Sequence, residues 1–201
     1  MLAFEEKITD NKPQFIQRVI EIAAALGTNP NWLMAVMNTE SGLNHKAQNT
    51  TYPLYNGPAT GLIQFTPDTA LSLGTNINAL KAMTNVKQLD YVYEYYEPYK
   101  GRLNSYFDAY MAVFFPAAIN KPDTWIFETS SIKRSAVARQ NPGIDLNKDG
   151  QITVAEFKGY LYRTIPARIK NLIFEVKEFV KKNPDLTAIL AITLLIIFMQ
   201  K

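Results

Sequence analysis

The chain has 201 residues, of which 47% are hydrophobic, and its formal net charge is +3. This length and composition place it among globular proteins with room for one domain and a real core. It has no cysteine, which excludes thiol catalysis, disulfides and zinc sites built on thiolates. The small net charge, without a dense Lys/Arg cluster, argues against a nucleic-acid partner.

The spacing of apolar residues predicts an almost entirely helical domain. Residues 13–26 carry apolar side chains at helical spacing. Residues 29–42 predict a second helix with clear ends. Asn29 can cap its first amides, Pro30 suits the first helical position, and Gly42 can take the left-handed conformation that ends it.

Glu40 lies at the end of this second helix, on an otherwise apolar stripe. Val36 and Met37 share its face, because residues three and four apart are neighbours on a helix. A carboxyl group there is poorly solvated, and loss of water raises its pKa toward neutrality. Glu40 is therefore a candidate general acid. The alternative is a Glu whose stem packs on the edge of the core while its carboxylate reaches water.

Further helices are expected along the chain. One begins at Thr66 and ends at Gly74, and another covers residues 84–98. A third, over residues 105–115, carries Tyr110. The segment 121–140 is expected to be irregular or mixed.

Three short motifs follow one another along this part of the chain. They are the first motif (Thr39–Gly42, TESG), the second motif (Gly61–Gln64, GLIQ) and the third motif (Ala109–Val113, AYMAV). Together they resemble the lytic transglycosylases and goose-type lysozymes, in which an E-S motif is followed by G-L-[MI]-Q and then by A-Y-N-A-G. The third motif departs from the family pattern, since Met111 replaces the usual Asn and Val113 the usual Gly.

The resemblance implies a lysozyme-like helical fold and cleavage of the MurNAc–GlcNAc bond of peptidoglycan by a single Glu. Glu40 would first protonate the leaving oxygen and then act as base, giving an anhydro-muramyl product. Ser41, Gln64 and Tyr110 would contact the substrate or orient the acid. For Tyr110, a core aromatic residue with a satisfied hydroxyl is an equally open alternative.

Residues 145–156 match the twelve-residue EF-hand loop, which binds Ca²⁺. Gly150 suits its sharp turn, and Ile152 is the apolar link that a neighbouring segment would cover. We expect a structural Ca²⁺ site, because sensing hands usually occur in pairs. A polar surface turn is the alternative. The ligands would be Asp145, Asn147 and Asp149 through their side chains, Gln151 through its carbonyl, Thr153 through a water, and Glu156 with both oxygens.

The character of the sequence changes after Pro166. Residues 166–183 carry one apolar stripe opposite basic residues and predict an amphipathic helix. Residues 185–200 form a hydrophobic tail, which we expect to anchor the protein in a lipid membrane. Its uncharged run, Leu186–Met199, is short for a spanning helix, so burial in an oligomer or a protein shell is the alternative.

The expected organisation is thus a lysozyme-like catalytic domain over residues 1–165, followed by the amphipathic helix and the tail. Glu5 and Glu6 stand where a signal peptide would need positive charge, so none is expected. A wall enzyme with a membrane tail and no signal peptide would suit a bacteriophage virion membrane or the host envelope, with assembly partners in the virion. The alternative function is a catalytically inactive, calcium-dependent and membrane-attached protein that binds the wall or builds the virion.

Overall fold

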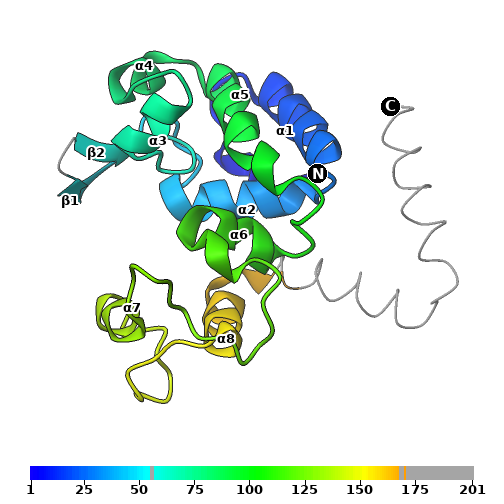
Figure 1. Cartoon of the computed structure of the whole chain (residues 1–201). Coiled ribbons are helices and arrows are strands. Elements are labelled where there is room, and N and C mark those ends of the chain that lie inside the picture. The colour runs from blue at the N-terminus through cyan, green and yellow to red at the C-terminus, as the bar shows by residue number, and fades with distance from the viewer. Residues whose placement is uncertain (55–56, 168–169, 171–201) are drawn as a thin grey trace, which may run out of the picture. The chain divides into compact units, whose positions relative to one another are not determined.

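Helices make up most of the regular structure in the computed structural model, which describes residues 1–54, 57–167 and 170. Contacts divide the chain into two units, Met1–Tyr160 and Leu161–Lys201. The expected mainly α class is confirmed for the described residues. Their α-helices are α1 (Lys12–Leu26), α2 (Pro30–Ser41), α3 (Pro67–Ser72), α4 (Ile77–Ala82), α5 (Asn85–Tyr96), α6 (Tyr106–Phe114), α7 (Arg134–Gln140) and α8 (Val154–Thr164) (Figure 1).

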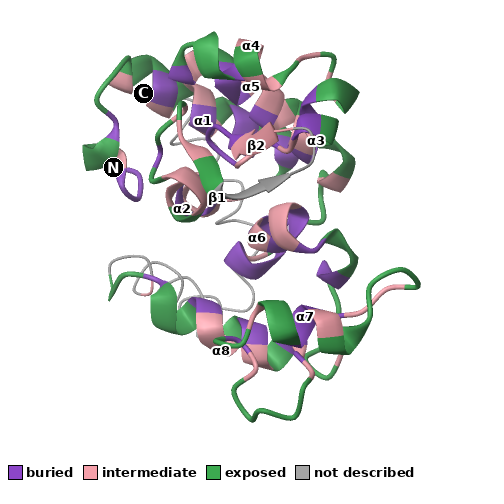
Figure 2. Cartoon of the chain, turned by 90° about the vertical axis from the view of Figure 1, so that its left-hand side faces the viewer, coloured by how far each residue is buried: buried purple, intermediate pink, exposed green. Residues whose placement is uncertain are grey.

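Helix α2 packs against both α1 and α6. Its ends follow from local chemistry, because the Asn29 side chain accepts a hydrogen bond from the Asn31 amide at 2.9 Å and Gly42 has a φ of +64°. In the first unit α1 and α5 bury one face and expose the other, whereas α6 has no exposed residue (Figure 2). In α2 the buried residues are Leu33, Met34, Ala35, Val36 and Met37.

An antiparallel hairpin replaces much of the loop expected between Glu40 and the second motif. Its strands are β1 (Gln48–Leu54) and β2 (Gly57–Thr60), paired with Gln48 opposite Thr60 and Asn49 opposite Ala59. The hairpin was not predicted because the β1 sequence is polar, lacks apolar alternation and contains Pro53. After β2 the second motif forms a tight turn, closed by backbone hydrogen bonds of 3.0 and 2.9 Å between Thr60 and Phe65.

Three of the described helices, α4, α7 and α8, were not predicted. Helix α4 begins after Asn76, whose side chain accepts a hydrogen bond from the Ala79 amide at 2.9 Å. Helix α7 occupies the end of the segment expected to be irregular or mixed, and the rest of that segment contains no helix. Single 3-10 turns lie at Glu5–Lys7, Glu97–Tyr99 and Pro116–Ala118.

The C-terminal predictions fall almost entirely outside the described residues. Of the expected amphipathic helix, only Pro166, Ala167 and Lys170 are described, and the hydrophobic tail over residues 185–200 is not. Among the helices that the structure does describe, none is both long and apolar enough to cross a membrane.

Candidate active site

Glu40 lies in the last turn of α2, above Val36 and Met37, which are fully buried. Burial raises the pKa of Glu40 from its ordinary value to about 7, and a hydrogen bond from the Tyr110 side chain opposes this rise. Near neutral pH such a carboxyl group exists in both its protonated and its ionised form. It can therefore give up a proton and take one back, as a general acid and base must.

Four tyrosines of α5 and α6 lie close enough to Glu40 to interact with it electrostatically, namely Tyr95, Tyr96, Tyr106 and Tyr110. Tyr95 and Tyr96 donate to backbone carbonyls of α6 at 2.8 and 3.0 Å, and Tyr106 bonds to a threonine hydroxyl at 3.2 Å. The Tyr110 hydroxyl is the one that bonds to the Glu40 carboxyl group. A hydroxyl that donates to a carboxylate stabilises the ionised form and also fixes its direction.

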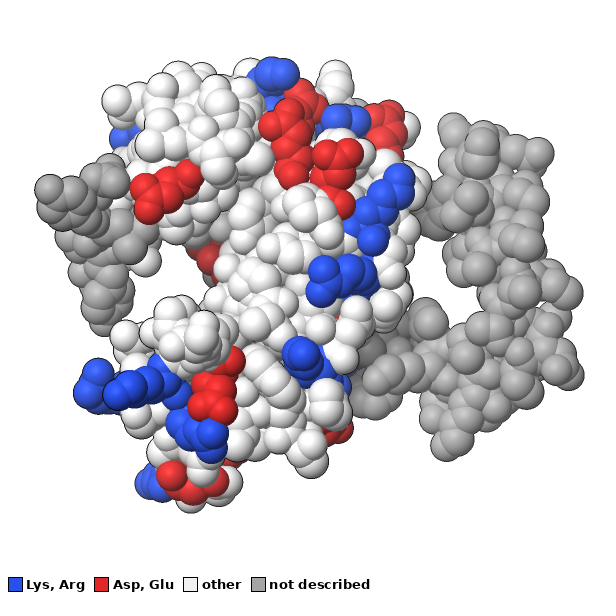
Figure 3. All heavy atoms as spheres, in the orientation of Figure 1, with Lys and Arg blue, Asp and Glu red and all other residues white. Residues whose placement is uncertain are grey.

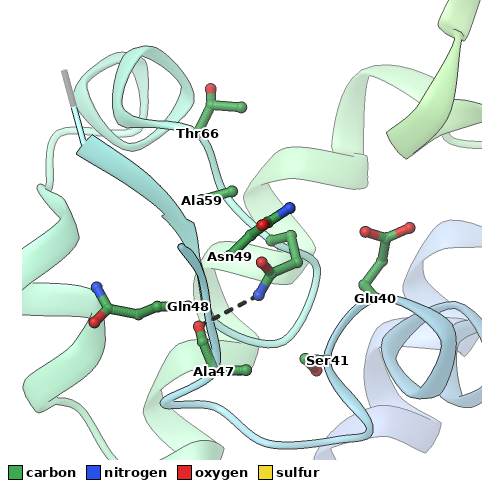
Figure 4. Close-up of a pocket in the computed structure, with 8 residues that line it drawn as sticks. Glu40, Ser41, Ala47, Gln48, Asn49, Ala59 and Thr66 are labelled. Carbon is green, nitrogen blue, oxygen red and sulfur yellow. Dashed lines mark hydrogen bonds between the residues drawn. The ribbon is translucent and has the colours of Figure 1, made fainter. Parts of the chain in front are cut away.

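Glu40 faces a cleft of about 550 Å³. Figure 4 shows the Glu40 carboxyl group on one side of this cleft and Asn49 and Ala59 of the hairpin on the other, while the Gln48 side chain points away from Glu40. These hairpin residues were not predicted as part of the site, because nothing in a polar segment indicates that it forms the wall of a cleft. The described lining residues are Glu40, Ser41, Ala47, Gln48, Asn49, Ala59, Gln64 and Thr66.

Apart from Glu40, the described lining residues are uncharged. Amide and hydroxyl groups of this kind can hydrogen-bond neutral sugar rings. On the face of the molecule shown in Figure 3, basic and acidic side chains of the described residues are mixed and form no broad patch of one charge.

Ser41 and Gln64 both line the cleft, but much of their hydrogen bonding stays within the protein. The Ser41 hydroxyl lies 2.9 Å from two possible acceptors, the carbonyls of Met37 and Leu62. The Gln64 amide nitrogen donates to the carbonyls of Gly61 at 3.0 Å and Ala47 at 3.3 Å, the second bond being dashed in Figure 4. These contacts join the end of α2, the hairpin and the second motif into one wall.

Gln88 of α5 holds the second motif from behind, and its role was not predicted. Its side chain is completely buried. Its carbonyl oxygen accepts from the Leu62 amide at 2.6 Å, while its nitrogen donates to the carbonyls of His45 and Leu80, both at 2.9 Å. Gly61 is required beside it, because an added Cβ would lie 2.5 Å from the Gln88 oxygen. A sequence signal existed, since Gln88 shares its helical face with Val92 and Tyr96.

The third motif lies on α6 and contributes Tyr110 to the site. Met111, which replaces the family's Asn, is completely buried, and Val113 is half-buried. Neither residue is among those that line the cleft. The two residues that depart from the family pattern therefore lie outside the described wall of the cleft.

Comparison with protein families adds to this geometry. Residues 17–115 match the family model described as Transglycosylase SLT domain. This SLT-type segment contains all three motifs and supports a relationship to the lytic transglycosylases and lysozyme-like proteins. No match was found among curated proteins or among solved structures.

The loop 145–156 follows the SLT-type segment in the chain. Gly150 has a φ of +79°, and Ile152 is completely buried, with its carbonyl accepting from the Phe127 amide at 2.9 Å. One Asp145 oxygen accepts from the Gly150 amide at 3.0 Å, and the other is buried without a hydrogen-bond partner. A buried carboxylate oxygen without a partner is costly, and a cation would satisfy it.

The other end of the loop carries a second pattern, a T-x-x-E helix cap that overlaps the EF-hand pattern. The Thr153 amide and hydroxyl donate to Glu156 at 2.9 and 2.8 Å, while the Glu156 amide donates to the Thr153 hydroxyl at 3.2 Å. This pattern caps the first turn of α8. Among the described residues, no three His, Cys, Asp or Glu side chains converge as a metal site. Thr153 and Glu156 thus bond to each other in the helix cap. None of these capping bonds reaches the buried Asp145 oxygen that lacks a partner.

Proposed function

We propose that the protein is a peptidoglycan-cleaving lytic transglycosylase that breaks the MurNAc–GlcNAc bond with Glu40. The observation that carries this proposal is the position of Glu40, whose pKa of about 7 coincides with its place at a cleft of about 550 Å³. The match of residues 17–115 to the SLT domain supports the reaction class and the substrate.

In the proposed reaction, protonated Glu40 gives its proton to the glycosidic oxygen as the bond from that oxygen to C1 of the muramyl residue breaks. The resulting carboxylate then takes the proton of a hydroxyl group of the same muramyl residue, whose oxygen bonds to C1. The products are an anhydro-muramyl end and a free GlcNAc hydroxyl, and Glu40 returns to its protonated form. Tyr110 keeps the carboxyl group directed at the cleft through both steps.

The composition of the cleft favours this single-Glu route. Glycosidases that use water or a covalent intermediate need a second carboxylate near the bond. Glu40 is the one carboxylate among the described residues that line the cleft. When the substrate supplies the attacking hydroxyl group, no second carboxylate is needed.

Digestion of purified cell-wall sacculi tests the proposal directly. We expect mass spectrometry of the released muropeptides to find anhydro-muramyl ends. Reducing ends in their place would identify a hydrolase and point to a missed second carboxylate. Binding to sacculi without any cleavage would favour the alternative, a wall-binding or virion structural protein.

We also propose that the loop 145–156 holds a structural Ca²⁺. The partnerless buried oxygen of Asp145 and the left-handed Gly150 support this site. Asp145, Asn147, Asp149 and Glu156 would supply side-chain oxygens, Gln151 its carbonyl and Thr153 a water-mediated contact. The ion would tie α8 to the segment around Phe127 and is assigned no part in bond cleavage.

The membrane anchor remains a proposal from sequence alone, based on the uncharged run Leu186–Met199. Lys181, Lys182 and Lys201 flank this run and could reach lipid headgroups. Flotation with liposomes tests it. The full chain should rise with lipid and a chain ending at Asn183 should not, whereas a full chain that stays soluble and monomeric without detergent would contradict it.

A further inference from the structure

An aromatic cluster connects the segment beyond the SLT match to the candidate active site. Its central ring is Phe157 of α8, which is 1% exposed. The Phe157 ring stacks on Phe127, with centroids 5.2 Å apart and planes 18° apart, and lies 4.9 Å from Phe114. It also lies 6.0 Å from Tyr110. A residue more than forty positions downstream of the third motif thus contacts the tyrosine that bonds to Glu40.

The Tyr110 ring contacts three other rings, of which Tyr106, one turn earlier on α6, lies at 6.2 Å. Phe114, one turn further along α6, stacks on it at 6.0 Å with planes 21° apart. Phe157 contacts it at 6.0 Å with planes 41° apart and comes from a different part of the chain. Because a tyrosine ring is rigid, contacts that fix the ring also fix the position of its hydroxyl.

We propose that Phe157 is a positioning residue, which keeps the Tyr110 hydroxyl on the Glu40 carboxyl group and so sets the protonation of the acid. This inference rests on the proposed function, in which Glu40 exchanges a proton with the substrate.

Phe157 is itself firmly placed. The capping contacts between Thr153 and Glu156 fix the first turn of α8 directly before it. Val154 adds a backbone bond of 2.9 Å to the Trp125 carbonyl. The same short stretch of chain therefore carries both the end of the loop 145–156 and the ring that supports Tyr110. The SLT-type segment alone, which ends at residue 115, lacks this support.

Loss of the contact between Phe157 and Tyr110 should be measurable as a change in the pKa of Glu40. The titratable groups that act on its environment are the four tyrosines of α5 and α6, and Tyr160 of α8 acts on Tyr106 and Tyr110. Burial raises the pKa of Glu40, and the Tyr110 bond opposes this rise. A loosened Tyr110 should therefore let the pKa of Glu40 rise further.

The test measures the pKa of Glu40 by NMR titration of its side-chain carboxyl carbon, together with the pH profile of sacculus cleavage, in the full chain. Phe157→Leu should raise this pKa in the same direction as Tyr110→Phe but by less. In the Tyr110→Phe background, Phe157→Leu should add no further shift, because the hydroxyl through which it acts is gone. An unchanged pKa in Phe157→Leu, or an equal shift in both backgrounds, would overturn the proposal.

Phe115→Leu is the matched control. Phe115 is buried in the same cluster and contacts Trp125 and Phe127, but its ring contacts do not include Tyr110 or Phe157. It should lower the melting temperature without moving the pKa of Glu40, and a shift equal to that of Phe157→Leu would mean that general loosening is the cause. Should Phe157→Leu fail to fold, Phe157→Met carries the same prediction, because its thioether fills volume without a ring. If sacculi are not cleaved at all, the proposed function fails while the NMR titration still decides the role of Phe157.

Discussion

Tyr110 lies close enough to Glu40 for its hydroxyl to hydrogen-bond to the carboxyl group, and this interaction acts against the burial that raises the pKa of Glu40 to about 7. The two residues lie on different helices, α6 and α2, which pack against each other. Their pairing gives the acid a fixed direction without abolishing its ability to hold a proton near neutral pH.

Replacing Glu40 by Gln should remove the proton donor and leave the fold intact. Loss of a positioned general acid typically lowers a rate by about 10²–10⁴-fold. We expect Glu40→Gln to bind sacculi and release almost no muropeptides, as measured by chromatography of the digest. Glu94→Gln, an exposed change on α5, is the control and should keep wild-type activity. Near-full activity in Glu40→Gln would contradict the assignment.

Replacing Tyr110 by Phe should move the pH dependence of cleavage. The hydrogen bond favours ionised Glu40, so its removal should raise the pKa of Glu40 above about 7. Because the first step needs protonated Glu40, the alkaline fall in kcat/KM should move to higher pH in Tyr110→Phe. A pH profile identical to that of the wild type would show that the bond does not set the protonation of the acid.

The same pKa makes a prediction for stability. The pKa of Glu40 is raised from 4.5 to about 7 in the folded protein. The folded state holds the Glu40 proton more tightly than the unfolded state does. The stability that this provides is fully present below pH 4.5 and is lost as the pH rises to about 7. A shift of this size corresponds to a cost on the order of 3 kcal/mol above neutral pH. Melting curves should show Glu40→Gln gaining stability over the wild type at pH 8 but not at pH 4, and equal differences at both would contradict the shift.

The sequence predicted those parts of the site that depend on local chemistry. The ends of α2 follow from Asn29 and Gly42, and the environment of Glu40 follows from Val36 and Met37 one turn away. The contact between Phe157 and Tyr110 could not be predicted, because it joins residues far apart in the chain and depends on how α8 packs. The Thr153–Glu156 cap was visible as a T-x-x-E pattern, but the overlapping EF-hand pattern explained the same two residues differently.

Gln88 allows a test of how the second motif is held. Gln88→Met keeps the approximate volume but leaves the Leu62 amide and the carbonyls of His45 and Leu80 without their bonds. An unpaired buried polar group costs about 1–3 kcal/mol. We expect a lower melting temperature and, because Gln64 lies in the displaced turn, a raised KM for sacculus fragments with a smaller change in kcat.

Gly61→Ala provides a second variant for the same contact. Its Cβ would lie 2.5 Å from the Gln88 oxygen, and its φ of +87° is unfavourable for any side chain. It should therefore reproduce the raised KM of Gln88→Met. Normal kinetics in both variants would show that the position of the second motif does not depend on Gln88.

Removal of Ca²⁺ should destabilise the protein if the loop 145–156 holds the ion. An ion present at about 100 times its dissociation constant adds about 2.7 kcal/mol to the free energy of unfolding. For a chain of this size that gain corresponds to a rise of roughly 5–10 °C in melting temperature, which a chelator should abolish. Asp145→Ala should melt at the same temperature with and without Ca²⁺, because it deletes the carboxylate whose buried oxygen has no other partner. Asp10→Ala, which removes an exposed carboxylate outside the loop, should keep the full response. A wild-type melting curve that does not respond to the chelator would mean that Glu156 serves only the helix cap and its bonds to the Leu146 and Asn147 amides.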